Sequence, residues 1–146
     1  SAWLFAATAM AEPAPADALR RAIERCGPYA HEPALPDGSV SGRVDMARGL
    51  AAYRKWSTAQ LAGLRCRRDA LAAFDASVAQ LRSEILNATN ANATAEAAPL
   101  SADLTASTGS DAPLRLQYNQ DATAYNAAGA AWQASVDSYN ARHPRD

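Results

Sequence analysis

Two cysteines, Cys26 and Cys66, carry the most recognisable chemistry in this chain of 146 residues. They lie 40 positions apart, outside any C-x-x-C motif and without a pair of histidines nearby. A redox pair or a zinc site brings its cysteines close together in the sequence, so neither fits this spacing. We expect one disulfide between them, as in exported proteins. The alternative is two unpaired buried thiols.

Other residues that could act as catalysts or ligands are scattered. His31 lies in a proline-rich stretch and His143 near the end of the chain, and no carboxylate cluster accompanies either. The sequence has no G-x-S-x-G or S-x-x-K motif and no glycine-rich phosphate loop. Asp69, Asp75 and Glu84 belong to one predicted helix but not to one stripe of it. We therefore predict no enzyme activity, no cofactor and no metal site.

The densest group of basic residues surrounds the second cysteine and consists of Arg65, Arg67 and Arg68. One interpretation is contact with an anionic lipid, a glycan or an acidic partner; the other is a solvated helix surface. Arg67 falls on the predicted core side of its helix. It needs a partner or a route to water, because burying an unpaired charge is costly.

Aromatic residues give the second hint of an interaction site. Most of them fit core positions, but Trp56 lies beside the predicted helical seam. Together with Tyr53 it could form an exposed platform for a partner or a sugar ring. Alternatively, the first helix covers it.

Composition favours helices packed closely through small side chains. The chain has 38 alanines, 13 arginines and one lysine, and its formal net charge is −1. Alanine is the best helix former but buries little apolar area. Because the net charge is near zero, we expect no general attraction to nucleic acid.

The first 11 residues resemble the end of a secretory signal peptide. An apolar stretch ends in Ala9-Met10-Ala11, an A-x-A pattern that precedes Glu12. The alternative is an ordinary apolar N-terminal segment. No apolar run approaches the ~20 residues that span a bilayer. We expect a bacterial periplasmic or secreted protein without a transmembrane span.

Three helices are predicted to position these residues. The first covers residues 15–26, and a proline-rich loop over residues 29–42 separates it from a long helix over residues 43–87. The third covers residues 114–142, and its aromatic stripe should pack against residues 71–85. Residues 88–113, rich in Asn, Ala, Thr and Ser, are expected to form a flexible connector.

Apolar residues of the long helix recur in heptad phase, as in a helix that packs against an antiparallel partner. Ser57, Gln60 and Arg67 interrupt the middle of this seam, and Cys66 lies at the interruption. A disulfide there would clamp the first helix over the weak part of the seam. The fold predicted is all-α: residues 12–146 form one domain, an elongated antiparallel helical hairpin with a short, disulfide-clamped N-terminal helix.

Several segments resemble a group of uncharacterised, exported, Ala-rich helical proteins of proteobacteria. The resemblance rests on residues 33–46 with their Pro-Asp-Gly turn, on Tyr53, on Leu64-Arg65-Cys66 and on residues 136–142. It covers about two-thirds of the chain and leaves out the connector. No activity is established for the group, so the resemblance implies export and a helical fold but transfers no site.

The function expected from these patterns is a non-enzymatic interaction or structural protein of the periplasm. Its partner would be another envelope protein or a second copy of the chain, as in an accessory subunit of an envelope assembly. The alternative is a binding module for a glycan, or an inhibitor of a secreted enzyme, that uses the Trp56 region.

Overall fold

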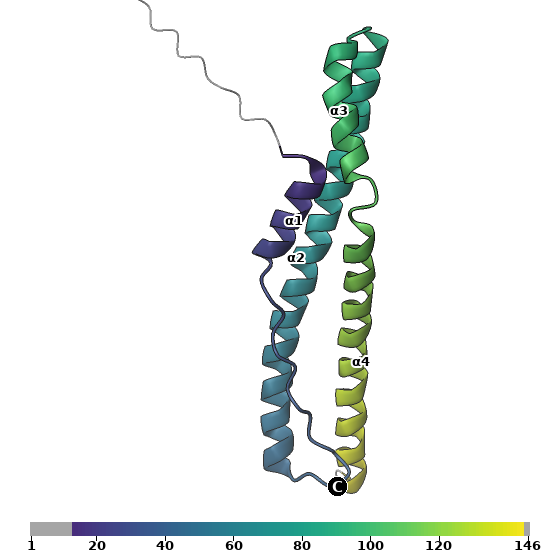
Figure 1. The fold of residues 1–146 in the computed structure, drawn as a ribbon. Coiled ribbons are helices and arrows are strands. Elements are labelled where there is room, and N and C mark those ends of the chain that lie inside the picture. Colours follow the sequence, from purple (N-terminus) through teal and green to yellow (C-terminus); the bar gives the residue numbers. More distant parts are fainter. Residues whose placement is uncertain (1–12, 145–146) are drawn as a thin grey trace, which may run out of the picture.

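The structure is a computed structural model that describes residues 13–144. The predicted signal segment, residues 1–11, lies outside the described residues. Those residues form an all-helical fold without strands (Figure 1). Its helices are α1 (Pro15–Arg25), α2 (Arg43–Asn90), α3 (Thr94–Ser107) and α4 (Ala112–Arg142).

The long helix α2 is one arm of an elongated antiparallel hairpin, and α3 followed by α4 is the other arm (Figure 1). With 48 residues, α2 extends for about 72 Å at 1.5 Å per residue. The short helix α1 packs on α2 and α3 near the middle of the molecule. The predicted hairpin with a short N-terminal helix is thus confirmed.

The expectation of an irregular connector over residues 88–113 is wrong for its central part, which is helix α3. Apart from Asp103, the buried and half-buried positions of α3 and the residue before it are Ala93, Ala97, Leu100, Leu104 and Ser107. They recur at alternating spacings of four and three, the period of a helix that packs on one side. The helical period was not visible in the sequence, because the side chains of this stretch are small or polar and its two sides differ little in hydrophobicity. Flexibility of the connector stays a prediction.

Most of α4 packs against a different part of α2 than expected. Its Trp132 ring stacks on Tyr53, with 5.7 Å between ring centroids, and Tyr125 lies 5.8 Å from Trp56. These contacts place most of α4 along the N-terminal half of α2. Only the start of α4 reaches the predicted stretch, where Leu114 and Tyr118 pack against the cluster that includes Leu71 and Phe74. The physical reason is α3, which occupies the first part of the return path beside the C-terminal part of α2.

The heptad pattern of α2 identifies its core side. Twelve positions of α2 recur in the two phases of the predicted heptad seam, and all are buried or half-buried: Met46, Leu50, Tyr53, Ser57, Gln60, Leu64, Arg67, Leu71, Phe74, Val78, Leu81 and Ile85. Leu19 of α1 joins Ala70, Leu71 and Phe74 in the main cluster. The core is thin, since Ser107 is the largest side chain with under 2% exposure among the described residues.

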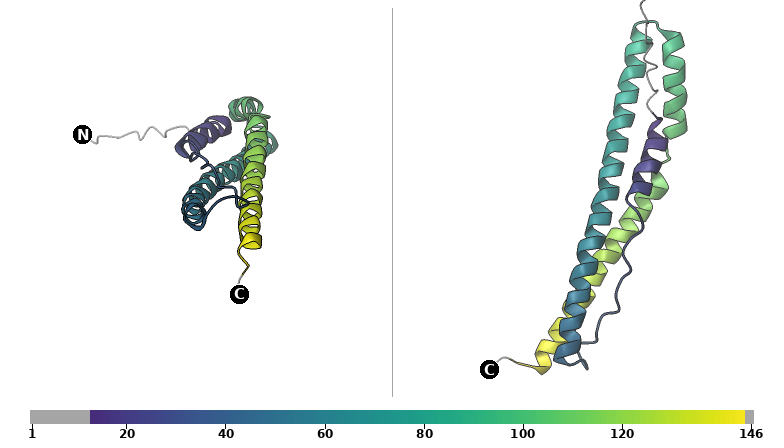
Figure 2. Two further views of the ribbon diagram at one scale, coloured as in Figure 1. Left: turned by 90° about the horizontal axis from the view of Figure 1, so that it is seen from below. Right: turned by 90° about the vertical axis from the view of Figure 1, so that its left-hand side faces the viewer.

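Residues 27–42, which we call the strap, run without regular structure from the end of α1 to the start of α2 (Figure 2). The strap is hydrogen-bonded to α4: the Gly38 amide donates to Ser135 Oγ at 2.9 Å, and Ser135 Oγ donates to the Pro36 carbonyl at 2.6 Å. Arg142 Nε donates to the Gly38 carbonyl at 3.1 Å. The strap therefore ties the two arms together at the end where α2 begins.

Candidate functional site

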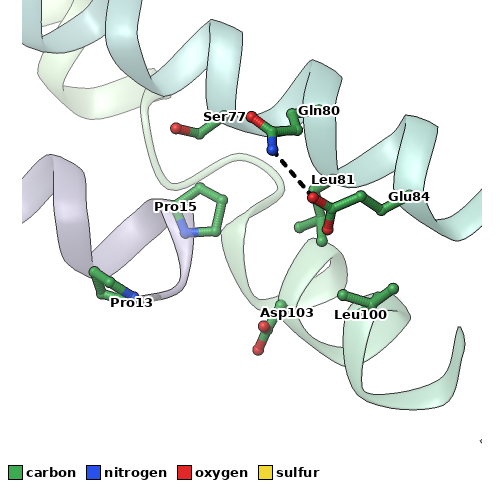
Figure 3. Close-up of a pocket in the computed structure, with 8 residues that line it drawn as sticks. All are labelled: Pro13, Pro15, Ser77, Gln80, Leu81, Glu84, Leu100 and Asp103. Carbon is green, nitrogen blue, oxygen red and sulfur yellow. Dashed lines mark hydrogen bonds between the residues drawn. The ribbon is translucent and has the colours of Figure 1, made fainter. Parts of the chain in front are cut away.

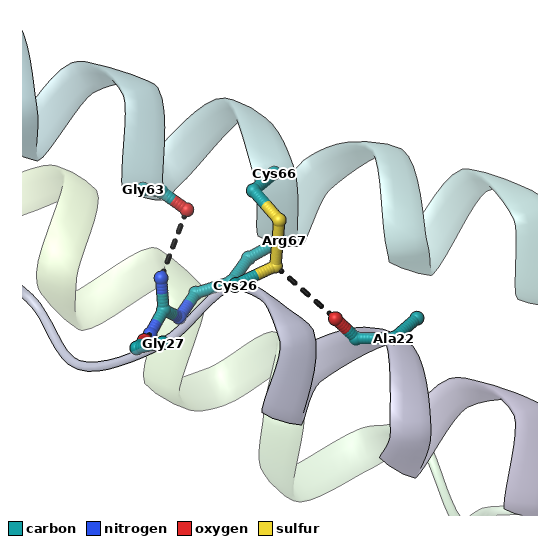
Figure 4. Close-up of a disulfide and its surroundings, with 6 residues drawn as sticks. All are labelled: Ala22, Cys26, Gly27, Gly63, Cys66 and Arg67. Carbon is teal, nitrogen blue, oxygen red and sulfur yellow. Dashed lines mark hydrogen bonds between the residues drawn. A yellow bond between two sulfur atoms is a disulfide. The ribbon is translucent and has the colours of Figure 1, made fainter.

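The predicted disulfide between Cys26 and Cys66 is present, with 5.7 Å between the two Cα atoms (Figure 4). Cys26 follows the last residue of α1, and Cys66 lies near the middle of α2. The bond therefore fixes both the end of α1 and the start of the strap on α2. The alternative of two unpaired thiols is wrong for this structure.

Arg67 has the partners that its place on the core side requires. Its Nη2 donates to the Gly27 carbonyl at 2.7 Å and its Nη1 to the Gly63 carbonyl at 2.9 Å (Figure 4). The guanidinium also lies over the Tyr29 ring, 3.8 Å from its centroid. The first residues of the strap thus cover Arg67, one of the polar residues that interrupt the apolar seam of α2. Helix α1 lies farther along α2, over Ala70 and Phe74.

Several polar atoms near this point are buried without a hydrogen-bond partner among the described residues. They are the Tyr29 hydroxyl, Trp56 Nε1, Gln60 Oε1 and Asp121 Oδ2. Burial raises the pKa of Tyr29 to about 12, and the nearby Asp121 carboxylate adds to the rise. No sequence pattern indicates Tyr29 or Asp121, because the two residues come close only when the strap meets α4.

The expectation that Trp56 forms an exposed aromatic platform is wrong, since only 6% of this residue is exposed. Its ring lies between Tyr53, at 6.0 Å, and Tyr125, at 5.8 Å. The strap, and not the first helix, provides its remaining cover, with His31 beside it. Trp56 is beside the seam, as predicted, but this side of α2 faces the strap. Tyr53, stacked on Trp132, belongs to the same aromatic cluster.

The basic group at residues 65–68 does not form one surface. Arg67 is directed to the strap, while Arg65 and Arg68 are exposed on α2. Arg68 forms an ion pair with Asp69 at 3.3 Å; Arg65 forms no ion pair with any described residue. Contact of Arg65 and Arg68 with a partner stays a prediction.

More basic residues share the exposed side of α2 than the sequence analysis recognised. We define the basic face as Arg43, Arg54, Arg65 and Arg68, which are exposed and lie on one side of α2 at about 3.6 residues per turn. Arg48 and Lys55 are also exposed, on another side of the same half of α2. These basic residues are spread over 26 positions, so no local cluster marks them. A comparison of net charge between parts of the chain could have found them.

Two surface hollows flank the hairpin. One lies between α1, α2 and α3 and carries the carboxylates of Glu84 and Asp103 (Figure 3). Glu84 accepts a hydrogen bond from Gln80 at 3.1 Å. The other is an apolar groove between α2 and α4, near the start of α2. Its lining residues are Arg43, Met46, Ala47, Leu50, Trp132, Val136 and Tyr139.

The two histidines do not share a site. His31 belongs to the strap and lies near Trp56, and His143 stacks on Tyr139 at the end of α4. Across residues 13–144, no three His, Cys, Asp or Glu side chains gather closely enough to hold a metal ion. Within the same residues, no helix combines the length and apolar character needed to cross a bilayer.

Comparison with protein-family models, curated proteins and solved structures finds no match for this chain. The resemblance to exported, Ala-rich helical proteins therefore stays a prediction, as do the periplasmic location and the partner.

Proposed function

We propose that this chain is an exported, non-enzymatic interaction protein of the bacterial periplasm, acting as an accessory subunit of a cell-envelope assembly. The observation that carries the proposal is a long hairpin with a thin core, held together by one disulfide. A fold of this kind leaves much of each helix available as lateral surface.

The disulfide supports export. Such bonds persist in oxidising compartments and are rare where thiols are kept reduced. Here the bond holds α1 on α2, and α1 itself buries only Pro15 and Leu19. The bond closes a loop of 40 residues in the unfolded chain and lowers the entropy of that state. The folded state is thereby stabilised by about 3–4 kcal/mol. The protein therefore gains much of its stability from a bond that an oxidising compartment preserves.

The start of α2 supports an interaction role. The apolar groove between α2 and α4 opens there, and two large hydrophobic residues close to it in sequence, Val40 and Val44, are 75% and 68% exposed. Exposed apolar surface beside a groove is characteristic of protein-binding surfaces. The alternative, a glycan-binding module or enzyme inhibitor built on Trp56, has no support, because Trp56 is buried.

The test is gentle purification from the native envelope, followed by light scattering and intact mass before and after reduction. We expect a stoichiometric protein partner or a self-associated species, and a mass increase of two hydrogen atoms on reduction of the disulfide. Replacing the exposed Val44 with Ser should weaken the association, whereas Leu116→Ser on the outer side of α4 serves as a matched control. A monomer that co-purifies with no partner would refute the accessory-subunit role.

A further inference from the structure

The N-terminal half of α2 has a strong excess of positive charge. Residues 43–68 contain seven basic residues and a single acidic one, Asp45. Since the whole chain has a formal net charge of −1, the remaining residues together carry −7. The near-neutral total therefore conceals a local concentration of charge on one helix.

Three arginines of the basic face lie in a row. Arg43, Arg54 and Arg65 are spaced by 11 residues, which is close to three full turns of an α-helix. At about 1.5 Å per residue, neighbouring members are about 16 Å apart and the row is about 33 Å long. The residues that lie between them on this side are small and exposed: Ala47, Ala51, Thr58 and Ala62.

The positive charge of the basic face is largely uncompensated within the structure. Among the described residues, Arg68 is the member that forms an ion pair, and its partner is the adjacent Asp69. By contrast, Arg115 of α4 bonds to both Asp75 and Asp111. All three arginines of the row are exposed, and Arg43 also borders the groove between α2 and α4.

We propose that the basic face binds the surface of an anionic phospholipid bilayer. Guanidinium groups bind phosphate well, and basic residues near an anionic membrane each contribute about 1 kcal/mol of attraction. At the start of the row, the exposed Val44 is positioned to enter the interfacial region.

The spacing of the arginines favours a membrane over an acidic protein. Cations about 16 Å apart, with small side chains between them, form no pocket for a specific acidic side chain. A bilayer presents many anionic headgroups that move laterally, so each arginine of a straight row meets a phosphate. This inference rests on the proposed location in the envelope, where such surfaces occur.

The test is co-sedimentation of the full, oxidised chain with vesicles of phosphatidylglycerol and, separately, of phosphatidylcholine. We expect binding to phosphatidylglycerol that weakens as salt is added, and little binding to phosphatidylcholine. The triple variant Arg43→Gln, Arg54→Gln, Arg65→Gln should bind about a hundredfold more weakly, or about fivefold per arginine.

A control variant with the same change in net charge distinguishes binding through the basic face from a general electrostatic attraction of the whole chain to the membrane. Arg20→Gln, Arg21→Gln, Arg82→Gln alters three exposed arginines on α1 and on the C-terminal half of α2. We expect it to retain most of the binding. Far-UV circular dichroism should show the same helix content in both variants.

Three outcomes would overturn the inference: no binding to phosphatidylglycerol, equal binding to both lipids, or equal losses in the two variants. Capture of an acidic protein through the basic face, without lipid binding, would also overturn it. A protein partner found in the native envelope together with absent lipid binding would leave the proposed function standing. Lipid binding by a chain that has no protein partner would support this inference and refute the accessory-subunit role.

Discussion

The contact between the strap and α4 can be tested at one glycine. A Cβ atom added at Gly38 would lie 2.6 Å from the carbonyl carbon of Ser135, closer still to its oxygen, and 3.0 Å from the amide nitrogen of Tyr139. These are backbone atoms of the C-terminal part of α4, held in its hydrogen-bonded helix, and cannot easily move aside. In Gly38→Ser, the strap must therefore withdraw from α4.

The expected loss of stability is the sum of the overpacking cost and the cost of the hydrogen bonds that the strap loses. Overpacking at a tight contact costs about 1–3 kcal/mol. Withdrawal also breaks the hydrogen bonds from the Gly38 amide to Ser135 and from Arg142 to the Gly38 carbonyl, at about 1 kcal/mol each. We expect a decrease of about 3–4 kcal/mol in the free energy of unfolding. For a chain of this size that lowers the Tm by about 10 °C.

Gly42→Ser is the matched control. Gly42 lies four residues away in the same strap, where an added Cβ meets nothing within 4 Å. It is the N-cap residue of α2, a position that serine suits well. Thermal unfolding of both variants, followed by circular dichroism, should show a large loss for Gly38→Ser and almost none for Gly42→Ser. Equal Tm values would refute the close packing of the strap on α4.

Other predictions concern the junction between the strap and α2. Replacing Cys26 and Cys66 with Ser should lower the free energy of unfolding by about 3–4 kcal/mol, measured by urea denaturation; an unchanged value would contradict a clamping role. Arg67→Lys should cost about 1–2 kcal/mol in the same assay, because lysine cannot bond both carbonyls in the same fork, whereas Arg65→Lys should be nearly neutral. Since the folded-state pKa of Tyr29 is about 12 against an ordinary 10.0, the free energy of unfolding should fall as pH rises from 10.0 to about 12. Tyr29→Phe should remove that part of the pH dependence, and an identical pH profile in this variant would contradict the assignment.

The elements with strong periodic signals were predictable from the sequence. The heptad pattern of α2 identified the buried side of this helix. Such a pattern marks the side that packs against other helices, whichever helices those are. Proline at the start of α1, and Gly27 with Pro28 after its end, set its limits through backbone geometry alone. The disulfide was predicted from two cysteines in a chain expected to be exported, and their spacing of 40 residues disfavoured a redox or zinc site.

What the sequence could not provide was the register between the arms. The aromatic stripe of α4 fits any apolar stretch of α2, so its partner depends on how much of the return path α3 occupies. That helix was missed because alanine, serine and threonine give little hydrophobic contrast between its two sides. The burial of Trp56 depended on the strap, and no local pattern in a proline-rich segment shows which helix face it will cover.

The disulfide, the strap and the basic face are connected through the position of Arg67. The disulfide holds Cys26 on α2, and Gly27, with a φ of 69°, then turns the chain so that its carbonyl accepts a hydrogen bond from Arg67. The same turn directs the strap along the inner side of α2, over Trp56, instead of over its outer side. The outer side, with its row of arginines, is thereby left uncovered. Loss of the Arg67 contacts should therefore disturb the strap before it disturbs the basic face, and hydrogen exchange in Arg67→Lys should show faster exchange in the strap while amides near Arg54 stay protected.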